Sequence, residues 1–165
     1  MALITGHLVR AVRCGDDLEA RAGMLLGSVL AGMAFSHSDV GSVHCLAESM
    51  GGLYDAPHGA CNAVILPEMM RHNRSACPER YAEVASAMGL LFDDVDQGAE
   101  EAVAYVRQLA KDVKLPGLRD LGLRDADFED LARRSVRNGS NASNPRPMAE
   151  EDYLHVLGRL VEERC

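Results

Sequence analysis

Hydrophobic residues recur at intervals of three and four along most of this chain, which is the pattern of amphipathic α-helices. The spacing predicts helices over Leu3–Arg13 and Leu18–Phe35, separated by a Gly-Asp-Asp break. Either Asp16 or Asp17 in this break can cap the second helix. Because Leu18–Phe35 is apolar around nearly its whole circumference, we expect that helix to be buried.

The middle of the chain is more apolar than the rest. A third helix is expected over Val40–Met50, and the two glycines that follow Met50 are a signal for its C-terminal end. A turn containing Pro57 then precedes a strongly apolar stretch, Ala60–His72. Its Val-Ile-Leu core could form a strand, but its length favours a buried helix, which we expect to bend at Pro67.

Four stripes in the second half repeat the i, i+3, i+4, i+7 spacing of a helix face. They are Tyr81–Met88, Val106–Val113, Phe128–Ser135 and Tyr153–Leu160. We expect Asp125 to cap the third of these helices. The pattern predicts seven or eight helices, with loops at residues 115–117 and 138–147. We therefore expect residues 1–165 to form a single helical domain.

Composition supports an all-α fold and narrows the classes of partner. Ala and Leu number 22 and 20, against two Ile and one Thr, which favours helix over strand. A net charge of −8 with 4% aromatic residues argues against nucleic acid as the main partner. No run approaches the ~20 consecutive apolar residues of a membrane span, so we expect no membrane partner.

The cysteines and the first residues favour a cytoplasmic protein. The five cysteines are scattered and form no CxxC pair, which is typical of reduced thiols, and we assign none of them a catalytic role. The first dozen residues lack a long apolar core and an A-x-A cleavage site, so secretion is not indicated.

Among the six histidines, His44 and His58 stand out by their surroundings. His44 lies on the third predicted helix, the chain then reverses at two glycines, and His58 arrives at the start of the next helix. Chain reversal can bring the two imidazoles to one point, and neutral imidazole suits Fe²⁺, Zn²⁺ and similar ions. On spacing alone, two histidines this far apart are a weak signal of a metal site.

The sequence around these histidines resembles the iron-containing (group III, metal-dependent) alcohol dehydrogenases. The matching motifs are Gly32-Met33-Ala34-Phe35-Ser36, the segment Gly41–Gly59 with its Pro-His-Gly end, Asn62–Pro67, and the late Asn144-Pro145-Arg146-Pro147. The resemblance covers nearly the whole chain. It implies that the chain is similar to the helical, metal-binding C-terminal domain of that family.

The resemblance implies roles for particular residues. His44 and His58 match two metal ligands of the family. Glu48 stands where the family has a histidine close to the reacting nicotinamide and substrate, so it is a candidate catalytic residue. Glu68 stands where the family often has a histidine after Leu-Pro. The family's other two ligands, an Asp and a His, lie in a helix upstream of this region.

The resemblance also implies partners. Family members begin with a dinucleotide-binding domain that contains a G-G-G-S phosphate loop, and neither that loop nor G-x-G-x-x-G occurs in this chain. The family reaction is hydride transfer between an alcohol or aldehyde and NAD(P), with a divalent metal on the substrate oxygen, more often Fe²⁺ than Zn²⁺. The chain would need the nucleotide domain, supplied by a separate nucleotide-binding chain or by a longer polypeptide, to be active.

Three hypotheses remain open at this point. The chain is the C-terminal part of such an alcohol dehydrogenase, inactive alone. Alternatively, it is a free-standing metal-binding helical protein in which His44, Glu48 and His58 form a two-histidine, one-carboxylate site. The third hypothesis is a non-catalytic interaction module. We also expect self-association, because a helical half-enzyme exposes the apolar face that its neighbour would cover.

Overall fold

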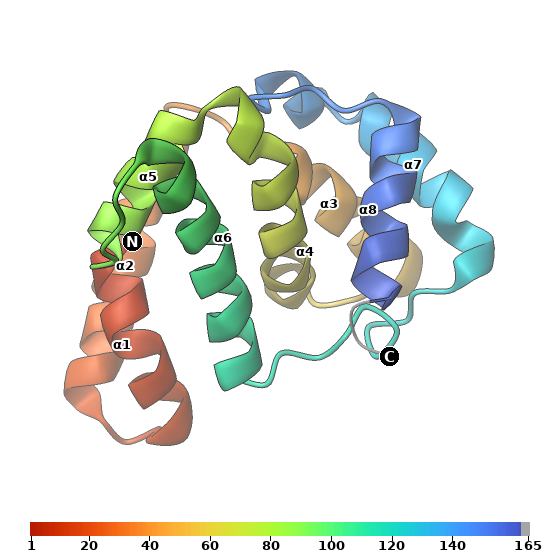
Figure 1. The fold of residues 1–165 in the computed structure, drawn as a ribbon. Helices are drawn as coiled ribbons and strands as arrows, with labels where there is room; N and C mark the ends of the chain where they lie inside the picture. The colour runs from red at the N-terminus through yellow and green to blue at the C-terminus, as the bar shows by residue number, and fades with distance from the viewer. Residues whose placement is uncertain (163–165) are drawn as a thin grey trace. The chain divides into compact units, whose positions relative to one another are not determined.

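The computed structural model describes residues 1–162, which form eight α-helices and three short 3₁₀ helices without a strand (Figure 1). The α-helices are α1 (Ala2–Arg13), α2 (Leu18–Phe35), α3 (Ser42–Tyr54), α4 (His58–Asn73), α5 (Pro78–Ala87), α6 (Val95–Asp112), α7 (Phe128–Arg137) and α8 (Glu150–Glu162). The 3₁₀ helices are η1 (Arg74–Ala76), η2 (Asp125–Asp127) and η3 (Gly139–Ser143). The all-α prediction is confirmed.

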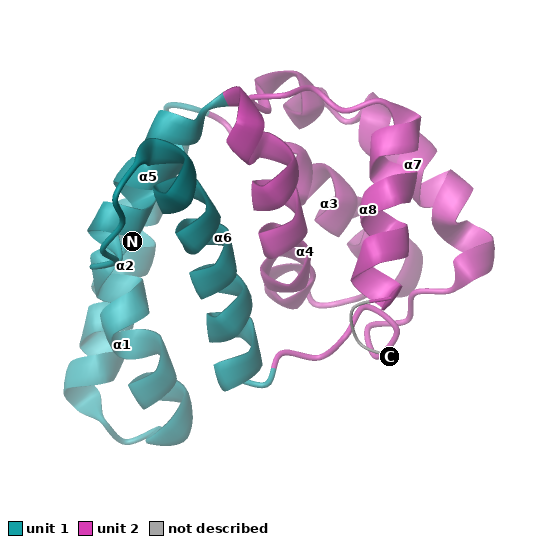
Figure 2. Cartoon of the chain, in the orientation of Figure 1, with its two compact units in different colours: residues 1–38, 77–114 teal, residues 39–76, 115–165 magenta. Residues whose placement is uncertain are grey.

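The chain divides into two compact units that alternate along the sequence (Figure 2). Unit 1 contains Met1–Ser38 and Cys77–Lys114, and therefore α1, α2, α5 and α6. Unit 2 contains Asp39–Ala76 and the residues from Leu115 on, and therefore α3, α4, α7 and α8.

Unit 1 pairs α1 with α2 and α5 with α6. The N-terminus of α2 is capped as predicted, since the carboxylate of Asp17 accepts a hydrogen bond from the Ala20 backbone N–H at 3.0 Å. Two glycines of α2 let α1 come close. A Cβ at Gly23 would lie 2.5 Å from the His7 ring, and one at Gly27 would lie 2.6 Å from Ile4.

The expectation that α2 is buried was wrong. Only Ala20 and Gly27 of this helix are buried, on the side that faces α1. Seven of its large hydrophobic side chains are at least half exposed, and they are Leu18, Leu25, Leu26, Val29, Leu30, Met33 and Phe35. A helix whose sequence is apolar on all sides has the side chains of a buried helix, but the pattern does not specify which other element would cover them. By length and composition, α2 is also sufficient to span a membrane.

Unit 2 has the larger hydrophobic core, to which all four of its helices contribute. Fully buried core residues are Cys45, Leu46 and Met50 of α3, Ile65 and Met69 of α4, Leu131 of α7, and Tyr153 and Leu157 of α8. The predicted stripes Phe128–Ser135 and Tyr153–Leu160 supply the residues of α7 and α8. This core fixes α3 and α4, the helices that carry His44 and His58.

The predicted end of α3 was wrong by one turn. The helix continues through both glycines to Tyr54 and ends at Asp55, which adopts the left-handed conformation with φ 53° and donates its N–H to Gly51. Tertiary packing decides this, because Leu53 and Tyr54 pack against the core and the Tyr54 hydroxyl donates to Asp127 at 2.8 Å.

The predicted cap of α7 was also wrong. Asp125 lies within η2, before α7 begins at Phe128, and its carboxylate pairs with the exposed Arg119 at 2.9 Å. Asp127 occupies the N-cap position of α7 without a side-chain capping hydrogen bond. Its carboxylate instead binds Tyr54 and Arg124. A hydrogen bond from α3 and an ion pair with the nearby Arg124 take the place of the local cap.

Candidate metal centre

His44 and His58 come together although 14 positions separate them. His44 lies in the first turn of α3 and His58 is the first residue of α4, and these two helices pack against each other. The centroids of the two imidazole rings are 5.3 Å apart and the rings are tilted by 52°. The sequence expectation that chain reversal brings these rings together is therefore confirmed.

His44 is half-buried, and its ring has an unused polar atom. Its Nδ1 is buried and has no hydrogen-bond partner. Burial lowers the pKa of His44, and the neighbouring His58 lowers it further, whereas Glu48 and Asp39 act in the opposite direction. The lowered pKa favours the neutral imidazole, which is the form that binds metal ions.

His58 is exposed and touches a second polar side chain, to which sequence reasoning assigned no role. Asn62, one turn later on α4, places its Nδ2 3.0 Å from His58 Nε2, and its Oδ1 is buried without a partner. The i, i+4 spacing of the two residues could have revealed this pair. Asn62 thus orients the His58 ring, and the three residues include two unpartnered buried polar atoms, His44 Nδ1 and Asn62 Oδ1.

Glu48 faces another element. It is exposed, and its Oε2 accepts a hydrogen bond from Asn138 Nδ2 at 2.7 Å. Among residues 1–162, no three His, Cys, Asp or Glu side chains lie close enough together to hold a metal ion. The structure therefore does not assemble the alternative site of His44, Glu48 and His58.

The loop with the Asn-Pro-Arg-Pro motif anchors the end of α3 that carries His44. The side chain of Asn144 is buried, and its Oδ1 accepts hydrogen bonds from Ser42 N at 3.2 Å and from Asn73 Nδ2 at 2.9 Å. Its Nδ2 donates to Asn73 Oδ1 at 2.7 Å and to the Arg146 carbonyl at 2.6 Å. Asn144 thus joins the start of α3 to the end of α4.

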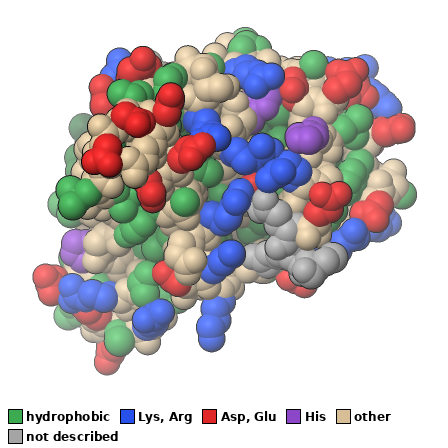
Figure 3. All heavy atoms as spheres, in the orientation of Figure 1, with side chains coloured by type: hydrophobic (Ala, Val, Ile, Leu, Met, Phe, Trp, Pro, Cys, Tyr) green, Lys and Arg blue, Asp and Glu red, His purple; other side chains and the backbone are tan. Residues whose placement is uncertain are grey.

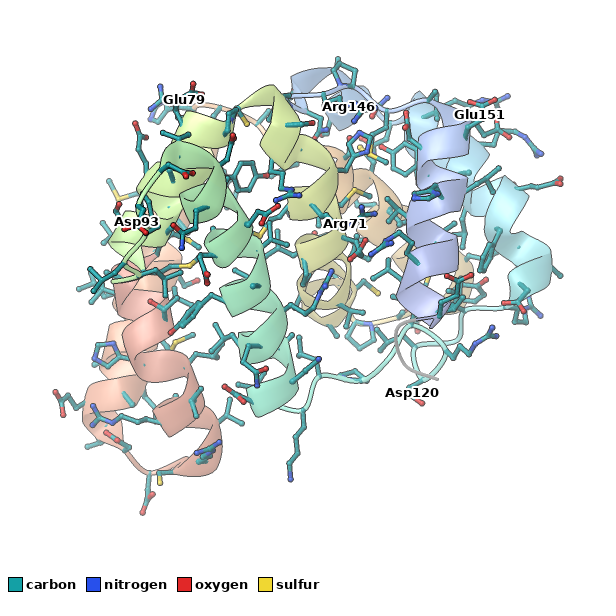
Figure 4. All side chains as sticks on the ribbon, viewed as in Figure 1. Arg71, Glu79, Asp93, Asp120, Arg146 and Glu151 are labelled. Atoms are coloured by element: carbon teal, nitrogen blue, oxygen red, sulfur yellow. The ribbon has the colours of Figure 1, made fainter. Side chains whose placement is uncertain are left out.

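Glu68 is buried away from solvent and makes structural contacts. Arg71 of α4 and Arg159 of α8 both donate from Nε to Glu68 Oε2, at 2.8 and 2.9 Å (Arg71 is labelled in Figure 4). Burial raises the pKa of Glu68, but the two arginines outweigh it and the pKa is lowered. Glu68 is therefore a carboxylate that ties α4 to α8.

The residues present fit two ligands of a metal ion. Two imidazoles with a buried, unpartnered nitrogen are suitable donors for a borderline divalent cation. Stable metal sites in proteins usually have three or four protein ligands, and residues 1–162 contribute a histidine pair. Two histidines are fewer donors than such a site uses.

Comparison with known proteins identifies the family. Residues 1–161 match the family described as "Fe-containing alcohol dehydrogenase family, C-terminal". The chain belongs to the iron-containing alcohol dehydrogenase family and is its C-terminal domain.

Relatives with named activities are alcohol and aldehyde oxidoreductases. The chain is 42% identical over 158 residues to a 1,3-propanediol dehydrogenase of Klebsiella pneumoniae, covering 94% of this chain and 41% of the relative. It is 36% identical over 157 residues to a lactaldehyde reductase of Escherichia coli K12, covering 93% and 41% of the two chains. The chain thus spans about two fifths of the length of these relatives.

Solved structures agree with this assignment. A 1,3-propanediol oxidoreductase shares 40% sequence identity and a TM-score of 0.93, with 96% of this chain and 42% of that chain covered. An alcohol dehydrogenase from Oenococcus oeni shares 38% identity and a TM-score of 0.91, with the same coverage. The fold described above is therefore that of the matching part of these enzymes.

Proposed function

We propose that this chain is the metal-binding part of an NAD(P)-linked alcohol dehydrogenase, in which His44 and His58 are two ligands of a divalent cation. The observation that most supports this proposal is that the two imidazole rings, on separate helices, have centroids only 5.3 Å apart. The family's named relatives act on alcohols and aldehydes, which supports the same substrate class for this chain. We assign Fe²⁺ rather than Zn²⁺ on the name of the family.

The residues of this chain hold and orient the ligands. Asn144 fixes the first turn of α3 and therefore the position of His44, while Asn62 orients His58. The lowered pKa of His44 keeps a lone pair available at neutral pH. When bound, the cation would supply Lewis-acid polarisation of an alcohol or aldehyde oxygen.

The remaining ligands and the nucleotide site belong to the N-terminal portion that full-length relatives carry. That portion can precede this domain in a longer polypeptide or exist as a separate nucleotide-binding chain. With two histidine ligands and no nucleotide site, residues 1–165 alone would be inactive. We propose that residues 1–165 form one domain of the enzyme. We place the enzyme in the cytoplasm, because its scattered cysteines suit a reducing compartment.

Metal titration of the purified chain tests the proposal. Fe²⁺ under anaerobic conditions, and Zn²⁺ separately, should bind wild-type protein. His44→Ala and His58→Ala should each weaken binding by about tenfold or more, which is about 1.4 kcal/mol. His155→Ala is the matched control, because His155 is an exposed histidine on α8, and it should bind like wild type.

Equal metal affinity of wild type and His44→Ala would contradict the metal assignment and leave the non-catalytic interaction module. Tight binding of NAD(P)H by the chain alone would contradict the placement of the nucleotide site in the N-terminal portion. Both measurements use the folded chain and need no enzymatic activity.

A further inference from the structure

Unit 2 carries a group of arginine and histidine side chains that the proposed function does not use. Arg71 and His72 lie near the end of α4, Arg146 lies in the loop before α8, and His155 lies in α8 itself. On the face drawn in Figure 3, basic and histidine side chains gather where Figure 1 draws α4 and α8. The chain as a whole has a net charge of −8, so this gathering differs from its average surface.

The packing of α4 against α8 brings the two histidines to the same end of this helix pair. The ion pair between Glu68 of α4 and Arg159 of α8, at 2.9 Å, fixes which turns of the two helices meet. The helices run in opposite directions (Figure 1). His72 lies one turn after Glu68, and His155 lies one turn before Arg159 on the other helix. Both steps lead to the same end of the pair, where α4 finishes and α8 begins.

The loop before α8 brings Arg146 to that same end. Asn144 exchanges two hydrogen bonds with Asn73, the last residue of α4, at 2.7 and 2.9 Å. Its Nδ2 also donates to the Arg146 carbonyl at 2.6 Å, so the backbone of Arg146 is tied to the last turn of α4. The Arg146 side chain is exposed, and within the described residues 1–162 its guanidinium makes no hydrogen bond or ion pair. This guanidinium is therefore available to a ligand.

His72 has a ring nitrogen without a partner. The ring is half-buried, and its Nε2 is buried and makes no hydrogen bond. Buried polar atoms in folded proteins nearly always have a partner, and an exception commonly marks the place of a water molecule or an ion. The last turn of α4 therefore holds an unsatisfied polar side chain beside the free guanidinium of Arg146.

The charged groups around His72 select the sign of such an ion. Burial lowers the pKa of His72 most, Arg146 lowers it next, and Arg71 and His155 lower it further. Asp152 of α8 acts in the opposite direction, and its carboxylate caps that helix by accepting the Ala149 N–H at 2.9 Å. Among residues 1–162, no three His, Cys, Asp or Glu side chains could hold a metal ion. The surroundings therefore favour an anion over a cation.

We infer that Arg146, His72 and His155 form a binding site for a small oxyanion of the phosphate class. The three side chains come from a loop and two helices, so they can approach a tetrahedral group from different sides. A planar carboxylate is matched instead by the parallel N–H groups of a single guanidinium. A bound anion would offset the repulsion between the cationic groups, and it would brace the loop in which Asn144 anchors the start of α3. This site is separate from the histidine pair and does not rest on the proposed function.

Calorimetric titration of the full chain with inorganic phosphate, at pH 7 and constant ionic strength, tests the inference. The wild type should bind phosphate saturably. Arg146→Gln and His155→Gln should each weaken the affinity by about tenfold or more, since each removes a hydrogen bond to a charged ligand. Both side chains are exposed, so neither substitution disturbs the core. Arg137→Gln is the matched control, because Arg137 is an exposed arginine on α7 of the same unit, and it should bind phosphate like wild type.

Two further probes define the ligand. Acetate at the same ionic strength should bind at least about tenfold more weakly than phosphate, and equal affinities would overturn the assignment to the phosphate class. Methyl phosphate distinguishes two sources of a phosphate group. Binding as tight as that of inorganic phosphate indicates the phosphate group of a larger molecule, and weaker binding indicates free phosphate. Either result supports the site.

Three results would overturn the inference: no saturable binding of phosphate by the wild type, equal affinity of the wild type and Arg146→Gln, or an equal loss of affinity in Arg137→Gln. The last would show a general effect of charge. Metal titration of Arg146→Gln should match wild type, because its side chain is exposed and makes no contact with His44 or His58. Failure of the anion site and failure of the metal site are therefore distinguishable.

Discussion

Replacing the buried Asn144 by Ala should markedly destabilise the folded chain. The side chain makes four hydrogen bonds, to Ser42 N, to both amide atoms of Asn73 and to the Arg146 carbonyl. At about 1 kcal/mol each, these bonds amount to about 4 kcal/mol. Because water can enter the vacated space and satisfy some of the partners, we expect a loss of about 3 kcal/mol.

Urea unfolding followed by circular dichroism at 222 nm measures this loss. For a chain of this size, about 3 kcal/mol corresponds to a fall in Tm of roughly 6–12 °C. Ser143→Ala is the matched control from the same loop, since its hydroxyl makes an exposed hydrogen bond to Asp39, and it should cost about 0.5 kcal/mol.

A double-mutant cycle separates the Asn144–Asn73 pair from the rest. Asn73→Ala and Asn144→Ala each remove the same two amide–amide hydrogen bonds, so the double variant should be about 1–2 kcal/mol more stable than the sum of the single losses predicts. If Asn144→Ala unfolded at the same urea concentration as Ser143→Ala, the bonds of Asn144 would not hold α3 to α4, and the anchoring of His44 would need another explanation.

Two further substitutions test other features of unit 2. Glu68→Gln should lower the free energy of unfolding by about 1–2 kcal/mol at pH 7, since Glu68 is buried while its partners Arg71 and Arg159 are about a third exposed. The control is Glu83→Gln, because Glu83 is exposed and pairs with the exposed Arg80, and it should cost about 0.5 kcal/mol or less. The pKa of Glu68 is lowered in the folded chain, so its contribution to the free energy of unfolding is complete above the unfolded pKa of about 4.3. The stability difference between wild type and Glu68→Gln should therefore shrink as pH falls through the lower, folded pKa. A difference that stays constant down to pH 3 would contradict this. Gly41→Ala, at the N-cap of α3, should cost about 2 kcal/mol, because a Cβ there would lie 2.7 Å from Asn144 Oδ1. Gly52→Ala, inside α3 with open space around it, should stabilise the chain by about 0.5–1 kcal/mol. Thermal unfolding of both variants measures the contrast, and a stable Gly41→Ala would show that Asn144 can move.

The sequence predicted part of the candidate site, and tertiary packing decided the rest. The motif around His44 and His58 marked both residues, and the reversal between two helices predicted that the rings meet. The motifs included Asn62 and Asn144, but sequence reasoning assigned no role to them or to Asn138. Asn138 and Asn144 lie 90 and 102 positions from the residues of α3 that they contact. It also left open a site containing Glu48, whose carboxylate binds Asn138 in the structure.

Local periodicity was sufficient to predict the all-α fold and the span of α2, and it narrowed the cap of α2 to Asp16 or Asp17, because these features depend on residues three or four positions apart. Tertiary structure alone decided that α3 continues through its two glycines, since contacts of Leu53 and Tyr54 outweigh the low helix propensity of glycine. It also decided that α2 is exposed, because burial is a property of two surfaces and the sequence of a helix describes one of them. The histidine pair depends on both levels. The sequence supplies the two imidazole side chains, and the packing of α3 on α4 brings their ring centroids to 5.3 Å from each other.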